Sequence, residues 1–134
     1  MISELLAEVE RRRRIMERLY DEFEEYRRRG EYGKAGESLW GIVNNMLYLL
    51  GLTQGVKLSR HGEFRDFVRD LATASNDADM IDEFRAAETL HANFYHEFMD
   101  EDLFTANSEK TWRLVRKLEK LLAGELAKLR LKAS

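Results

Sequence analysis

The chain has 134 residues, of which 44% are hydrophobic and 35% charged, a composition typical of a soluble globular domain with a buried core. Its formal net charge of −3 gives no overall attraction to nucleic acid, so such binding would need a local basic patch. The absence of cysteine excludes disulfides, thiol nucleophiles and cysteine zinc sites, and it fits a cytoplasmic protein. The absence of proline favours long helices.

The first predicted element is a helix over about residues 4–29, with Ser3 as its N-cap and Gly30 as its stop. Its apolar residues recur at three- and four-residue steps. Four consecutive arginines at residues 11–14 surround such a helix rather than form one face. We therefore expect them to be solvated or ion-paired, and a nucleic acid or protein partner is the alternative.

The second predicted helix, over about residues 31–52, is apolar nearly all round and contains no run long enough to span a membrane. This pattern indicates a central helix that the others cover. Gly41 lowers helix propensity by about 1 kcal/mol relative to alanine, so we expect another helix to pass close to it. A more polar stripe on this helix consists of Glu37, Gly41, Asn44 and Tyr48.

The rest of the sequence predicts three further helices, the first of them capped by Ser59 and carrying His61 in its first turn. No strand pattern and no internal repeat is visible. We expect an all-α fold, an up-and-down bundle of four to five helices forming one domain over residues 1–134. The expected helices cover about residues 60–72, 78–99 and 109–132, and the expected loops cover 53–57, 74–79 and 100–108.

Residues 88–99 contain an unusual concentration of polar and aromatic side chains. On a helix, His91 would lie in a stripe that faces inward. Asn93 would lie on the opposite, outward side, where it would face another helix, a dimer partner or solvent. A histidine in an apolar stripe needs a hydrogen-bond partner, and Glu37, Asn44 or Tyr48 could supply it. The expected inward stripe consists of Phe84, Ala87, His91, Phe94, Tyr95 and Phe98.

Three short motifs carry a resemblance to a known family: Glu37-Ser38-Leu39-Trp40-Gly41, Ser59-Arg60-His61 and Leu90-His91-Ala92-Asn93-Phe94-Tyr95. Their order and spacing resemble the PaREP family of archaeal proteins, within the wider HEPN-like superfamily, over about residues 4–122. The resemblance implies a HEPN-like helical domain that forms a homodimer, with RNA or nucleotide as the ligand class. We expect no membrane partner, because no apolar run is long enough to span a bilayer.

Many members of that superfamily are ribonucleases with an arginine followed, after four to six residues, by a histidine. Arg85 and His91 have this spacing, so the resemblance implies a catalytic pair in which His91 is the base and Arg85 binds the phosphate. Three functions are open. They are a dimeric RNA- or nucleotide-associated binding protein, a structural or protein-interaction module with a polar core, and a metal-independent ribonuclease.

In the second of these functions, Glu37, Asn44, His61 and His91 would form one inner polar network. We expect no metal and no cofactor, because His91 and His96 lie about 140° apart on a helix and a second Glu-x-x-His unit is missing. The candidate residues for ligand binding or for the inner network are Glu37, Trp40, Asn44, His61, Asn93 and Tyr95.

Overall fold

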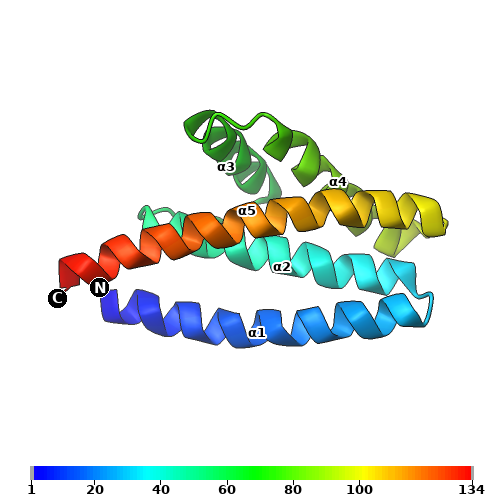
Figure 1. The fold of residues 1–134 in the computed structure, drawn as a ribbon, viewed down its shortest axis with the longest axis horizontal. Helices are drawn as coiled ribbons and strands as arrows, with labels where there is room; N and C mark the ends of the chain where they lie inside the picture. The colour runs from blue at the N-terminus through cyan, green and yellow to red at the C-terminus, as the bar shows by residue number, and fades with distance from the viewer. Residues whose placement is uncertain (1, 134) are drawn as a thin grey trace.

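The computed structural model describes residues 2–133 and contains five α-helices in that part of the chain (Figure 1). No strand occurs among these residues, which confirms the predicted all-α bundle. The long helices α1, α2 and α5 run side by side, and α3 and α4 lie together on one side of them. The helices are α1 (Ile2–Arg28), α2 (Tyr32–Thr53), α3 (His61–Ala74), α4 (Asp79–His96) and α5 (Glu101–Ala133).

Helix α2 is the centre of the fold, as its apolar pattern predicts. It packs against each of the other four helices, and its Leu39, Ile42 and Leu47 are completely buried. Glycines allow two of these contacts to be close. A methyl group added at Gly41 would lie 3.0 Å from Leu19 Cδ1 of α1, which confirms the predicted close helix contact. One added at Gly36 would lie 3.2 Å from Leu90 Cβ of α4.

The start of α3 differs from its predicted form. The N-cap residue is Arg60 rather than Ser59, and the helix begins at His61. The carboxylate of Glu63 satisfies the free backbone donors, because its Oε1 accepts hydrogen bonds from the N–H groups of Ser59 at 3.0 Å and Arg60 at 2.8 Å. The Ser59 hydroxyl also donates to this oxygen, so it supports the cap without being the cap.

The predicted loop at residues 100–108 is wrong, because α5 already begins at Glu101. Asp100 caps the helix, with its Oδ1 accepting a hydrogen bond from the Leu103 N–H at 2.9 Å. Phe104 is buried in this first part of α5 and stacks on Tyr32 with ring centres 4.7 Å apart. The polar composition of residues 100–108 suggested a loop, but the buried Phe104 and the Asp100 cap stabilise a helix there.

Helix α4 is also shorter than predicted, and it ends at His96 rather than near residue 99. Glu97 adopts a left-handed conformation with φ 47°, which stops the helix. Among residues 2–133, no helix combines the length and the apolar character that crossing a membrane requires.

Candidate functional site

One side of α4 carries the polar residues that the sequence singles out. Arg85, Glu88, His91 and Tyr95 follow one another at three- and four-residue steps, so successive side chains lie next to each other on the helix, although Arg85 and His91 are about 120° apart. Arg85 and Tyr95 are exposed, and Glu88 and His91 are partly exposed. These four residues border α2 at one end and α3 at the other.

His91 contacts α2 through both a carboxylate and an aromatic ring. Its Nδ1 lies 2.8 Å from Oε2 and 3.1 Å from Oε1 of Glu37, a hydrogen bond that fixes the orientation of the imidazole. The same imidazole stacks on Trp40, with ring centres 4.9 Å apart and planes at 21°. The His91 side chain keeps 35% of its surface exposed, so the contact orients the histidine without removing it from solvent.

His61 approaches the same tryptophan from α3. Its ring centre lies 5.5 Å from that of Trp40, and its Nε2 lies 2.6 Å from Oε2 of Glu88 on α4. Each of the two histidines is thus paired with a carboxylate from another helix and packs against Trp40. With 45% of its side-chain surface exposed, His61 is also accessible from solvent.

Glu88 joins this histidine to an arginine, because its Oε2 also accepts a hydrogen bond from Arg65 at 2.9 Å. Burial of Glu88 raises its pKa, but the hydrogen bonds from His61 and Arg65 outweigh this effect. The pKa of Glu88 therefore lies below its ordinary value, and the carboxylate stays charged in the pH range where proteins are stable.

A pocket of about 220 Å³ lies next to Glu88, between α3 and α4. Three arginines line it, Arg65, Arg69 and Arg85, together with Glu88, whose carboxylate already pairs with Arg65. Among residues 2–133, Arg69 and Arg85 have only long ion pairs of 3.7 Å, with Asp66 and Asp82, and the side chains of both are more than half exposed. Ion pairs of this kind contribute little free energy, so both guanidinium groups are available to a ligand. The apolar part of the lining consists of Val68, Ile81 and Phe84.

The structure separates the predicted inner network into parts. Glu37, Trp40, His61 and His91 lie together, as described above. Asn44 does not join them, because its Nδ2 donates to the backbone carbonyl of Trp40, one turn earlier in its own helix. Tyr48 lies under the guanidinium of Arg12, 3.8 Å from ring centre to Cζ, and so belongs to the contact between α1 and α2.

The prediction that Asn93 lies on an outward side, open to solvent, is wrong. Asn93 is only 2% exposed, and its Oδ1 accepts hydrogen bonds from the backbone N–H groups of Phe98 at 2.8 Å and Met99 at 2.9 Å. Both N–H groups belong to the turn that follows α4. Asn93 therefore holds the chain as it leaves the helix, and it does not contact His91.

The predicted inward position of three aromatic residues is also wrong, because Phe94, Tyr95 and Phe98 are 37%, 66% and 51% exposed. The buried side of α4 instead includes Phe84, Ala87, Leu90 and Asn93. Gly36 lets α2 approach Leu90 closely, which turns that side of α4 toward the core. The aromatic residues at the end of the helix remain at the surface.

Arg85 and His91 are not brought together within one chain. Arg85 lines the pocket and pairs with Asp82, whereas His91 contacts Glu37, Trp40 and Tyr95. The described residues therefore provide no contact partner that the two side chains share. The spacing that the sequence suggested as a catalytic pair corresponds to two different surroundings on α4.

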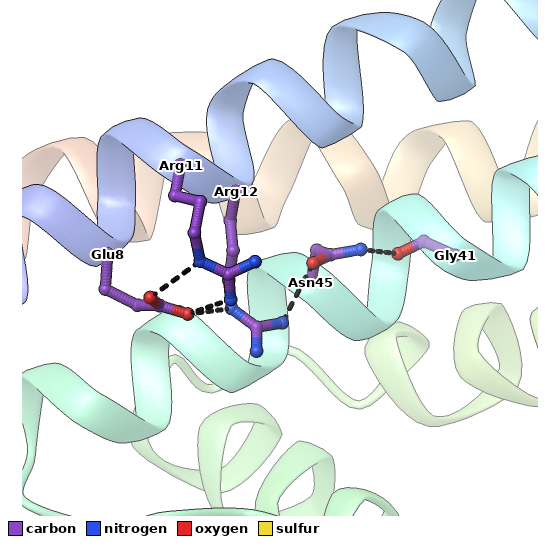
Figure 2. A network of polar contacts seen from close by, with 5 residues as sticks. All are labelled: Glu8, Arg11, Arg12, Gly41 and Asn45. Carbon is purple, nitrogen blue, oxygen red and sulfur yellow. Dashed lines mark hydrogen bonds and ion pairs between the residues drawn. The ribbon is translucent and has the colours of Figure 1, made fainter.

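The arginine run at residues 11–14 forms ion pairs within α1, and Arg12 also contacts Asn45 and Tyr48 of α2; Figure 2 shows the contacts of Arg11 and Arg12 with Glu8 and of Arg12 with Asn45. Glu8 accepts hydrogen bonds from Arg11 and Arg12, which lower the pKa of Glu8 to about 2. Arg12 also donates to Oδ1 of Asn45 at 2.9 Å. Arg13 pairs with Glu10 and Glu17. The ion-paired interpretation of the run is confirmed for Arg11, Arg12 and Arg13.

In the part of the chain that the structure describes, no three or more histidine, aspartate or glutamate side chains are grouped so that they could hold a metal ion. Glu88, which has helical spacing to His91, binds His61 and Arg65 instead.

Sequence reasoning overlooked Arg65 and Arg69, which supply two of the three cations of the pocket. Their four-residue spacing places them on one side of α3, and this was the available signal. What the sequence could not reveal is that this side of α3 meets the side of α4 that carries Arg85.

Residues 11–118 match the family model of the archaeal PaREP1/PaREP8 family. This range includes the histidines, their carboxylate partners and the three arginines of the pocket. No curated protein and no solved structure matches the chain.

Proposed function

The chain belongs to the archaeal PaREP1/PaREP8 family, and we propose that it binds RNA or a nucleotide through the pocket between α3 and α4. The observation that carries this proposal is the convergence of Arg65, Arg69 and Arg85 on one pocket. The resemblance to HEPN-like proteins adds support for this class of ligand.

Arginine suits the proposed role because its planar guanidinium can donate two parallel hydrogen bonds to a phosphate. Glu88, which also lines the pocket, pairs with Arg65, but Arg69 and Arg85 still make the pocket locally basic although the chain has a net charge of −3. Phe84, Val68 and Ile81 add an apolar surface on which a base or a ribose could rest. At about 220 Å³ the pocket is smaller than the roughly 300–1,000 Å³ of drug-sized sites, so it would hold a phosphate group and only part of the attached nucleoside.

Fluorescence anisotropy with a labelled RNA of six nucleotides, and with adenosine monophosphate as competitor, tests the proposal. We expect Arg69→Gln and Arg85→Gln to weaken binding of both ligands. Because each arginine would neutralise a phosphate, each substitution should also reduce the slope of log affinity against log salt by up to about 0.7.

The matched control is Arg27→Gln, which removes an exposed arginine of α1 that pairs with Glu24, away from the pocket. Arg27→Gln changes the net charge by the same amount as Arg69→Gln and Arg85→Gln do. Equal losses in all three variants would show that binding depends on overall charge alone, and no binding by the unsubstituted protein would contradict the proposal.

The alternative is a structural or protein-interaction module, and the contact of Glu37 with His91 favours it. On this alternative, the histidines and Trp40 only fix how α2, α3 and α4 pack. On this alternative the unsubstituted protein does not bind nucleic acid. Replacing Glu37 by leucine and His91 by phenylalanine together would then change only the packing of these helices.

Ribonuclease chemistry is not part of the proposal, because Arg85 and His91 have different partners within the chain. Incubating the protein and a His91→Ala variant with a mixed RNA pool checks this directly. We expect no cleavage that depends on His91.

A further inference from the structure

The arginine pocket is continuous with a row of aromatic rings that ends in exposed side chains. His61 begins the row, and it is joined to the pocket through its hydrogen bond to Glu88. Each ring contacts the next, although the residues come from α2, α3 and α4. In order the rings are His61, Trp40, His91, Tyr95 and Phe94, with successive centres 5.5, 4.9, 5.4 and 5.0 Å apart.

The row differs from an ordinary hydrophobic core at its far end. Trp40 is buried, but Tyr95 is 66% exposed and Phe98, two residues after the end of α4, is 51% exposed. No hydrogen bond of the Tyr95 hydroxyl occurs among the described residues, and its ring contacts those of His91 and Phe94. Exposed aromatic rings next to accessible histidines are what stacking with a base requires.

The distance along α4 sets the size of the ligand. Arg85 and Tyr95 are ten residues apart in α4, which corresponds to about 15 Å along the helix axis. A single nucleotide in the arginine pocket is too short to reach Tyr95. A chain of several nucleotides could reach it, and its bases must be unpaired for one of them to stack on the ring.

From this arrangement we infer that the site takes a single strand of nucleic acid. One phosphate lies among Arg65, Arg69 and Arg85, the strand passes over His61 and His91, and a later base stacks on Tyr95. This inference rests on the proposed function and names the form of its ligand. Charge complementarity at the pocket favours a polyanion over an apolar partner.

A second pocket of about 300 Å³ lies beyond Phe94, between the α1–α2 turn and the end of α4. Lys34 lines it, but the carboxylates of Glu31 and Glu97 line it as well. With this balance of charge the pocket is not suited to a phosphate. We therefore place no phosphate there, and the strand is held by cations at one end and by stacking at the other.

The decisive experiment compares four ligands by competition anisotropy: adenosine monophosphate, a six-nucleotide RNA, a DNA of the same sequence, and the RNA as a duplex. We expect the six-nucleotide single strand to bind more tightly than the mononucleotide and the duplex. Comparison of RNA with DNA then shows whether the 2′-hydroxyl contributes.

Tyr95→Leu and Tyr95→Phe test the stacking contact. Loss of one base–aromatic stack corresponds to roughly a 5- to 150-fold weaker affinity, which we expect for Tyr95→Leu with the single strand. Tyr95→Phe keeps the ring and should bind nearly as the unsubstituted protein does. Mononucleotide binding should not change in either variant. Leu103→Ala removes another exposed apolar side chain, 49% exposed on α5, and serves as the control.

The possible failures are distinct. If the mononucleotide binds but Tyr95→Leu leaves single-strand affinity unchanged, or if the duplex binds equally well, the inference is overturned and the proposed function stands. If neither the mononucleotide nor the single strand binds, both the inference and the proposed function are overturned. If Tyr95→Leu converts a dimer to a monomer in sedimentation while RNA affinity is unchanged, a second chain covers these rings instead.

Discussion

Asn93 shows how one buried side chain can determine where a helix ends. Its Oδ1 satisfies two backbone donors in the turn after α4, at 2.8 and 2.9 Å. We expect Asn93→Ala to lower the free energy of unfolding by about 1–3 kcal/mol, because both donors lose their partner in a buried setting. Urea denaturation measures this. Asn107→Ala, which removes only an exposed bond to the carbonyl of Leu103, should change it by less than about 0.5 kcal/mol.

Glu88 gives the stability of the protein a small dependence on pH. Because its pKa is lower in the folded protein than in the unfolded chain, its contribution is present above the unfolded value of about 4.3. The contribution disappears as the pH falls through the lower folded value. We expect Glu88→Gln to be less stable by up to about 1 kcal/mol near neutral pH. Denaturation of both proteins at a series of pH values should show this difference vanish in acid; a constant difference would contradict it.

Between elements, the contact of α2 with α4 depends on a glycine. We expect Gly36→Ala to destabilise the fold by about 1–2 kcal/mol, because overpacking against Leu90 outweighs the better helix propensity of alanine. Gly124→Ala is the matched control in α5, where an added methyl group meets no atom within 4 Å. It should stabilise by about 0.5–1 kcal/mol. Thermal unfolding that moves in the same direction for both variants would show that close packing at Gly36 is unimportant.

The contact of α4 with α5 depends on an ion pair. Glu83 is 4% exposed, and both of its carboxylate oxygens lie 2.9 Å from Nζ of Lys117. We expect Lys117→Met to cost about 2–3 kcal/mol of unfolding free energy, because it leaves the charge of Glu83 buried without its main partner. Adding Glu83→Leu should recover at least half of this loss. If the double variant is less stable than Lys117→Met alone, the unpaired charge of Glu83 is not the cause of the loss, and the explanation is contradicted.

For the whole molecule, the homodimer implied by the resemblance stays a prediction. Sedimentation equilibrium over a range of protein concentrations measures it directly. We expect a mass of two chains, and the same mass in the Tyr95→Leu variant, since Tyr95 stacks on a nucleic-acid base and not on a second chain. A single-chain mass at all concentrations would contradict the prediction.

The fold was largely predictable because the apolar residues of the long helices recur at three- and four-residue steps, and this pattern shows which side of each helix is buried. The apolar pattern of α2 identified the central helix, and Gly30 and Gly55 occur where the backbone takes a φ of +75°. The site was predictable only in part. The sequence suggested Glu37 as a partner of His91, but Arg65 and Arg69 became relevant only once α3 was placed against α4. Asn93 was predicted on the wrong side of its helix, because a helical wheel gives the angles between side chains but does not show which side of the helix faces the core.

The first turns of α1 and the last turns of α5 lie at the same end of the bundle, where Ile2, Leu5 and Leu129 line a common pocket. The two helices extend from there toward the opposite end of the molecule (Figure 1). A mechanical load applied between the chain ends would therefore peel α1 and α5 away turn by turn, rather than slide whole helices past one another. In an optical trap the protein should open at low force, starting at the end remote from Tyr95.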